Sequence, residues 1–291
     1  MSDSRGVVFD LGYQPHEGER LGRAGAVRAL YRDGLRKVLG LRRRARQKVF
    51  PWLLLSIAIL PALFFIAFGV ISGELGQDEF FDHGLYFELT GAITLVFVAL
   101  ASSELLVPDR INGITAVYAS RPLTVIDYLT GRAAALGTVV VGFLYLPHLI
   151  LLLGRAWVSS DGFGTYIADN IEILWQTALA SFLYFVAFGS LGLLVAAFAT
   201  RTAAAVFAVV LLVPISGPAS AVLVDSDTFS GAGLLALQHH PGYVKDWILS
   251  DNAHNWIPER AGFEPIVSLV MIGLIAAAAA IAVYERYRRL R

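Results

Sequence analysis

The chain has 291 residues, of which 56% are hydrophobic and 16% are charged, and its mean hydropathy is +0.64. This composition excludes an ordinary soluble globular protein and predicts an all-α integral membrane protein. The formal net charge is zero, but this sum hides a separation of basic from acidic segments along the chain. The lack of cysteine excludes a disulfide framework and any thiolate metal site.

Polar and basic residues dominate the chain before the first long apolar segment. Residues 1–20 contain Gly and Pro, show no cleavable signal peptide, and are predicted to be a flexible segment. Residues 21–49 are predicted to form a basic amphipathic interfacial helix with its apolar face at the acyl boundary. The apolar stripe, at spacings of three and four, consists of Val27, Leu30, Tyr31, Leu35, Val38 and Leu39. Two interpretations stay open: a simple positive-inside anchor, or an elbow helix that also contacts a partner protein.

Six segments are long enough to cross a hydrocarbon core at about 1.5 Å per residue. They run from Phe50 to Ile71, Leu85 to Leu106, Ala133 to Leu153, Ile173 to Phe198, Ala203 to Ile215 and Pro265 to Tyr284. Pro214, Gly217 and Pro218 are expected to bend or break the chain at the far end of the fifth segment. The prediction is a six-span domain over residues 50–284, followed by a basic tail over residues 285–291.

Basic residues flank the first and last predicted spans, which predicts that both termini lie in the cytoplasm. The run Arg42-Arg43-Arg44 is attributed to this topology and not to nucleic-acid binding. Six spans then place a connector over residues 107–132 inside the cell and a large region over residues 216–264 outside it. The expected location is the cell membrane of a prokaryote, where membrane lipids are partners.

The connector over residues 107–132 holds the most specific chemistry in the chain. Pro108 and Asp109 are predicted to begin a short helix on the membrane surface, because the N-terminus of a helix favours a carboxylate. Gly113 permits a turn or a close approach of the backbone. The predicted connector is therefore a short coupling helix followed by a hinge.

The second half of the connector predicts a helix start. Pro122 keeps Arg121 out of the helical region and so ends the short helix. Thr124 and Asp127 have the spacing of a capping box, which would start the helix that leads into the third span. The candidate site residues are Asp109, Arg110, Gly113, Thr115, Ser120, Arg121, Pro122, Thr124, Asp127 and Tyr128.

Glu88 and Glu104 lie near opposite ends of the second predicted span. A carboxylate at these depths can reach headgroup water, and the alternative is that one of them faces a substrate path. No group of several charged residues is expected at mid-membrane depth. Because ion-coupled secondary transporters use buried ionisable groups, this expectation argues against that class.

The region over residues 216–264 is predicted to contain one or two short helices separated by His239-His240-Pro241-Gly242. A metal site of His239, His240 and His254 is not favoured, because adjacent His side chains diverge and a closed zinc site needs about four ligands. The sequence also lacks a phosphate-binding loop, a zinc-binding helix motif and a nucleophile elbow. No metal, cofactor or enzymatic activity is therefore predicted for this chain.

The connector resembles that of the type-2 ABC exporter permease family. The resemblance is carried by Asp109-Arg110, Gly113-Ile114-Thr115, Ser120-Arg121-Pro122-Leu123-Thr124, Asp127-Tyr128 and Gly131-Arg132, between the second and third predicted spans. It covers nearly the whole chain in topology but only residues 109–132 in motif. Gly113-Ile114-Thr115 departs from the adjacent Gly-Thr that is commoner in that family, whereas Ser120-Arg121-Pro122 matches well.

The resemblance implies that the connector docks on a separate ATP-binding subunit, which would bind ATP and Mg. It also implies that two permease subunits, identical or related, pair to form the translocation path. The expected function is that of a permease subunit of an ATP-driven exporter, which itself hydrolyses nothing. Two other functions stay open: a membrane anchor or scaffold whose connector binds a non-ATPase partner, and an ion-coupled secondary transporter.

Overall fold

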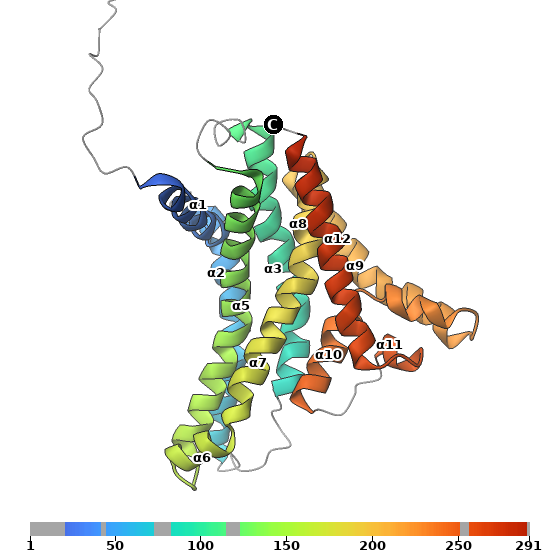
Figure 1. Ribbon diagram of the computed structural model, residues 1–291. Coiled ribbons are helices and arrows are strands. Elements are labelled where there is room, and N and C mark those ends of the chain that lie inside the picture. Colours follow the sequence, from blue (N-terminus) through green and yellow to red (C-terminus); the bar gives the residue numbers. More distant parts are fainter. Residues whose placement is uncertain (1–20, 42–44, 73–82, 115–122, 251–255, 290–291) are drawn as a thin grey trace, which may run out of the picture.

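A computed structural model describes residues 21–41, 45–72, 83–114, 123–250 and 256–289. All regular structure in these ranges is helical, as the sequence predicts. The elements are α1 (Gly22–Val38), α2 (Ala45–Ser72), α3 (His83–Ile111), α5 (Val125–Val158), α6 (Phe163–Asp169), α7 (Ile171–Tyr184), η1 (Phe185–Gly189), α8 (Ser190–Phe198), α9 (Thr202–Asp225), η2 (Ser230–Leu235), α10 (His239–Leu249), α11 (Ile257–Arg260) and α12 (Pro265–Arg288). Figure 1 shows the long helices in one bundle, with α1 beside one end and α10 and α11 near the other.

Five helical segments in the described part of the chain are long and apolar enough to cross a membrane. They are α3, α5, the continuous path α7–η1–α8, α9 and α12. The chain is therefore a multi-pass, membrane-embedded helical protein. The first predicted span, Phe50 to Ile71, falls within α2, where the apolar stretch Pro51–Ala67 is shorter than the other five. A sixth crossing stays a prediction.

Two helices run further than the sequence predicts. α9 continues through Pro214 and Pro218 to Asp225, so of the expected bend or break the break does not occur, and the start of the region predicted to lie outside is helical. A proline removes one backbone donor, but α9 keeps its path because it packs on α3, α8 and η2. Figure 1 shows the later part of α9 leaning away from the bundle. Likewise α12 reaches Arg288, so the predicted basic tail over residues 285–291 begins as helix.

The predicted interfacial helix over residues 21–49 is interrupted. Gly40 adopts a positive φ of 64° just after α1. The amide of Leu41 donates to the carbonyl of Arg36 at 2.8 Å, and the amide of Gly40 donates to that of Lys37 at 3.1 Å. This pair of hydrogen bonds is a Schellman motif, which ends helices at a left-handed glycine. The last residues of the predicted range belong to α2 instead.

Part of the apolar stripe of α1 faces protein. Leu30, Gly34 and Val38 are buried where α1 packs on α3 and α5, whereas the other stripe residues are partly exposed, and their place at the acyl boundary stays a prediction. Gly34 makes the closest approach, because a Cβ added there would lie 2.6 Å from the Cβ of Ala135 in α5. The missing side chain at this position allows α1 to lie tightly against α5.

The substitution Gly34→Ala is expected to weaken the docking of α1 on α5, because neither methyl carbon can rotate away from the other. Overpacking of this kind costs about 1–3 kcal/mol. The measurement is the thermal unfolding midpoint of the detergent-solubilised protein. Gly142→Ala is the matched control, since a Cβ added there meets nothing within 4 Å and alanine is a better helix former than glycine. A midpoint for Gly34→Ala at or above that of the control would contradict the contact.

The path from α7 to α8 passes through a π-turn, η1. A π-turn holds one residue more than an α-helical turn and is often found at functional sites. Phe185 in this turn packs against two glycines, because a Cβ added at Gly137 or Gly189 would lie 2.9 or 2.8 Å from its ring. Phe185 also lines an apolar cavity of about 280 Å³ between α5, α8 and α12.

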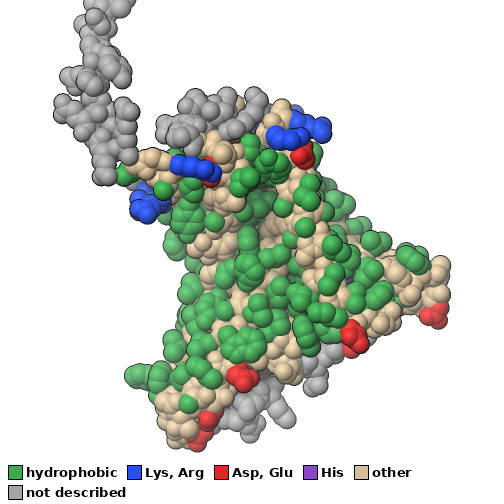
Figure 2. Space-filling view, viewed as in Figure 1, with side chains coloured by type: hydrophobic (Ala, Val, Ile, Leu, Met, Phe, Trp, Pro, Cys, Tyr) green, Lys and Arg blue, Asp and Glu red, His purple; other side chains and the backbone are tan. Residues whose placement is uncertain are grey.

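The two ends of the bundle differ in charge. Figure 2 shows Lys and Arg side chains near α1 and near the last turns of α12, whereas the opposite end of this face carries acidic side chains. We name the first end the α1 end and the second the α10 end. The separation agrees with the distribution of charge along the sequence.

Candidate functional site at the α1 end

Four charged side chains meet at the α1 end and form the buried ion cluster: Asp33 and Lys37 of α1, Asp109 of α3, and Arg132 of α5. The carboxylate of Asp109 binds Nζ of Lys37 and Nη2 of Arg132, each at 2.6 Å. Nη1 of Arg132 donates to Asp33 at 2.8 Å, and Lys37 lies 3.3 Å from Asp33. The side chains of Asp109 and Arg132 are 1% and 0% exposed. The cluster thus ties three helices together inside the protein.

The formal charges of the buried ion cluster balance. Its two carboxylates face two cations, and an ion taken out of water costs several kcal/mol unless partners of opposite charge offset the loss of hydration. Burial opposes the ionisation of Asp33, but hydrogen bonds from Arg132 and the positive charges of Lys37 and Arg132 outweigh it and lower the pKa of Asp33. The ion pairs of Asp33 are therefore lost only when the pH falls through this lowered pKa.

Tyr128 links the cluster to a fourth helix. Its hydroxyl donates to Oδ2 of Asp109 at 3.1 Å. The guanidinium of Arg132 lies 5.6 Å from the centre of its ring, a cation–π distance. On the other side the ring stacks on Tyr287 of α12, with centroids 5.4 Å apart. Tyr128 therefore connects the first turn of α5 with the last turns of both α3 and α12.

The prediction that Pro108 and Asp109 begin a short surface helix is wrong. Both residues lie in the last turns of α3. The C-terminal end of a helix disfavours a carboxylate, and the cations of Lys37 and Arg132 offset this at Asp109. Asp109 and Tyr128 are also buried, so their side chains join α3 to α5 inside the protein and are not exposed for docking. The sequence pattern could not distinguish these two roles.

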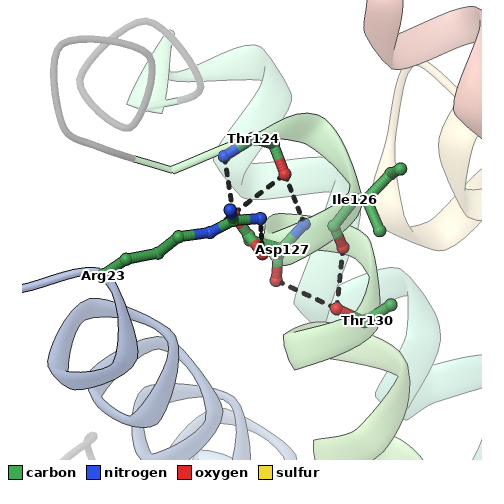
Figure 3. A network of polar contacts seen from close by, with 5 residues as sticks. All are labelled: Arg23, Thr124, Ile126, Asp127 and Thr130. Atoms are coloured by element: carbon green, nitrogen blue, oxygen red, sulfur yellow. Dashed lines mark hydrogen bonds and ion pairs between the residues drawn. The ribbon is translucent and has the colours of Figure 1, made fainter.

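The capping box of Thr124 and Asp127 is confirmed. The amide of Asp127 donates to Oγ1 of Thr124 at 3.1 Å, and the amide of Thr124 donates to Oδ2 of Asp127 at 2.8 Å. Arg23 of α1 adds a second interaction that the sequence did not suggest. Its Nε and Nη2 donate to the two oxygens of Asp127, each at 2.9 Å, as Figure 3 shows. We call this bidentate pair the Arg23 clamp; it joins the start of α1 to the start of α5.

The structure describes some of the remaining predicted site residues and not others. Gly113 has a φ of 66°, which confirms a turn that requires glycine. Arg110 donates to the backbone carbonyl of Ala199 at the end of α8. Four residues of the predicted site lie outside the described ranges: Thr115, Ser120, Arg121 and Pro122. Of the two acidic candidates in the second span, both Glu88 and Glu104 are partly exposed.

The α10 end contains a second buried polar group that the sequence did not predict. Lys245 of α10 is 0% exposed; it binds Asp246, lies 3.7 Å from Glu88 of α3, and donates to the carbonyl of Gly84 at 3.2 Å. Trp256 donates through Nε1 to Asp246. The sequence predicted short helices in this region but not their burial, and α10 packs on α3, α7 and α12. The adjacent Lys and Asp within an apolar stretch were the sequence signal that could have indicated this buried ion pair.

The histidines of α10 begin a helix and do not separate two. Pro241 occupies the first turn of α10, where its missing amide hydrogen has no intrahelical partner to lose. His240 is engaged at both ring nitrogens: Nε2 donates to the carbonyl of Leu234, so Nδ1 accepts from the hydroxyl of Ser268, both at 2.9 Å. Burial lowers the pKa of His240, which favours this neutral form. His254, the third residue of the disfavoured metal site, lies outside the described ranges.

A comparison with models of known protein families finds no match, and a comparison with curated proteins finds none either. The fold and the site therefore define only a broad class of protein. The chain is a multi-pass helical membrane protein whose α1 end is held by the buried ion cluster and the Arg23 clamp.

Proposed function

We propose that the chain is the transmembrane permease subunit of an ATP-driven exporter, with both termini and the α1 end in the cytoplasm. In this proposal it pairs with a second permease subunit, and separate subunits bind ATP and Mg. The resemblance of residues 109–132 to type-2 ABC exporter permeases motivates the assignment. The basic residues of the α1 end support the orientation, because basic flanks are retained on the cytoplasmic side.

One observation supports the mechanism more than any other. The hydrogen bond of 3.1 Å between Tyr128 and Asp109 joins the two helices from which the connector leaves and to which it returns. A force applied to the connector would therefore act on α3 and α5 together. The Arg23 clamp adds α1 to the same unit, since it binds Asp127 at the start of α5.

The proposed mechanism is a transfer of motion. Closure of the ATP-binding subunits pushes on the connector, and the linked ends of α3 and α5 shift as one piece against the second permease subunit. The bundle then opens a path to the outside. In this account Arg121 contacts the partner, whereas Asp127 positions α5 through its cap and through Arg23.

The first test is whether an ATPase copurifies with the tagged full chain. The second compares Asp127→Asn and Arg121→Ala with the control Asp161→Asn, which removes an exposed carboxylate far from the connector. Both test variants should insert normally but transport about tenfold less per ATP hydrolysed, the factor expected for the loss of one charge-assisted hydrogen bond of about 1.5 kcal/mol. Transport is measured with a panel of fluorescent lipids and hydrophobic compounds in proteoliposomes. Wild-type coupling in both variants would defeat the assigned roles.

A second candidate function, an ion-coupled secondary transporter, is favoured by the buried Lys245 and Asp246, with the partly exposed Glu88 beside them. Buried ionisable groups are what coupling ions bind in that class. Transport driven by an ion gradient in proteoliposomes that contain this chain alone would support it. Transport that requires an ATPase and ignores ion gradients would support the exporter. A copurified partner without any ATPase activity would instead favour a scaffold.

A further inference from the structure

A groove runs between α1 and α5 at the α1 end, with a volume of about 750 Å³. Arg23 and Arg28 lie on its basic side together with Asp127, and the rest of the lining is mostly small or apolar. The lining residues that matter here are Arg23, Arg28, Val27, Tyr31, Gly131 and Ala134. The groove is separate from the buried ion cluster, because none of the four cluster residues lines it.

Both arginines keep donors for a further anion. Arg23 uses Nε and Nη2 in its clamp on Asp127, which leaves its Nη1 donors and one Nη2 hydrogen. Its side chain is 61% exposed, so these donors face the surroundings. Arg28 is exposed and makes no hydrogen bond or ion pair with any residue in the described ranges. With Asp127 counted, the groove carries one excess positive charge.

The apolar part of the groove is lined by Val27 of α1 and Ala134 of α5. Ala134 is exposed and carries only a methyl group, whereas Gly131 is buried under the side chain of Leu30, which would lie 3.0 Å from an added Cβ. The hydroxyl groups of Tyr31 and Thr138 are 3.0 Å apart and join the two helices further along α5. The groove thus combines a basic rim with an apolar wall on a helix that is long and apolar enough to cross a membrane.

This combination fits an amphiphile with a negative headgroup. A basic rim alone would bind any anion, but a free phosphate has no apolar surface to bury against Val27 and Ala134. An apolar wall alone would suit any acyl chain, but it would not place two arginines beside it. Basic residues at a membrane surface attract anionic headgroups, and tyrosine favours the same depth because its ring is apolar and its hydroxyl polar. Figure 2 shows basic side chains directly beside apolar ones at α1.

We propose that the groove between α1 and α5 binds one anionic phospholipid, with its headgroup phosphate on Arg28 and Arg23 and an acyl chain along Val27 and Ala134. The lipid would bridge the same two helices that the Arg23 clamp joins. It would therefore stabilise the docking of α1 on α5 without displacing Asp127. The inference does not depend on the proposed transport function, since it concerns only the groove.

The test uses the full chain in detergent, titrated with phosphatidylglycerol or with phosphatidylcholine, and reads the thermal unfolding midpoint and the bound lipid by native mass spectrometry. Arg28→Gln should weaken phosphatidylglycerol binding about fivefold, the factor that corresponds to one basic residue near an anionic headgroup. Arg32→Gln is the matched control, because Arg32 is exposed one turn along α1 and does not line the groove. Ala134→Phe should reduce binding by filling the groove while leaving every charge in place.

Three outcomes would overturn the proposal. Equal loss of binding in Arg28→Gln and Arg32→Gln would mean that the helix attracts anionic lipid through its overall charge. Equal stabilisation by phosphatidylcholine would remove the role of the headgroup. Displacement of the lipid by inorganic phosphate at matched ionic strength would identify an anion site without a lipid requirement. If Ala134→Phe does not fold, the comparison of the two arginine variants still decides between a defined site and general attraction.

Discussion

Asp109→Asn is expected to destabilise the protein by about 3–5 kcal/mol, the range for removing one partner of a buried ion pair. The variant would leave Lys37 and Arg132 with a single carboxylate, Asp33, which lies partly at the surface. Two buried cations would then share one carboxylate, which offsets their lost hydration less than two carboxylates do. The measurement is the thermal unfolding midpoint in detergent, with tryptophan fluorescence as the signal.

The control for this prediction is Asp225→Asn. Asp225 forms an ion pair of 2.9 Å with Arg260, but both side chains are substantially exposed. Exposed pairs contribute about 0–1 kcal/mol, so this variant should unfold close to the wild type. The double variant Asp109→Asn with Lys37→Met restores charge balance and should recover part of the lost stability. Equal midpoints for Asp109→Asn and Asp225→Asn would show that the buried ion cluster does not act as described.

Lys245→Met is the second large effect, again about 3–5 kcal/mol. Lys245 is the cation that faces the buried carboxylate of Asp246, so its loss removes this positive charge, and the donor Trp256 that remains is neutral. Because the cation also binds Gly84 and Glu88 of α3, α10 should loosen from the bundle. Amide hydrogen exchange across α10 should therefore accelerate relative to exchange in α5.

Glu88→Gln provides the comparison at the α10 end. Glu88 lies 3.7 Å from Lys245 and is 28% exposed, so its charge is partly screened by solvent. We expect this variant to lose less than about 1 kcal/mol and to leave exchange in α10 almost unchanged. A larger effect for Glu88→Gln than for Lys245→Met would contradict the prediction that the pair of Lys245 and Asp246 anchors α10.

Local signals in the sequence predicted local structure correctly. The capping box of Thr124 and Asp127 depends on residues three apart, and its chemistry is the same in every helix start. The turn at Gly113 follows from the freedom of glycine at positive φ. The Schellman motif at Gly40 was equally local, and a glycine after a basic last turn was the signal that could have ended α1 correctly.

Interactions between distant residues were not predictable in the same way. Asp109 meets Lys37 across 72 positions and Arg132 across 23, and no period in the sequence specifies which acidic residue will meet which basic one. The apolar stripe of α1 predicted which face is apolar, but not that α3 and α5 cover it at Leu30 and Val38, because lipid and protein interiors are both apolar. A short helix was predicted around Lys245, but its packing into the bundle was not, since that depends on contacts with α3, α7 and α12.

The π-turn of η1 sets which residues of α8 face α3. One extra residue in a helix rotates everything after it by about 100°, because an α-helix turns once in about 3.6 residues. Beyond this rotation, Gly192 meets Ser102 so closely that an added Cβ would lie 2.7 Å from the Ser102 hydroxyl oxygen. Relaxing η1 to an ordinary α-helical turn would swing Gly192 off α3 and present a neighbouring leucine there. The extra residue of η1 therefore sets the rotation of α8 relative to α7, and with it the face that α8 turns to α3.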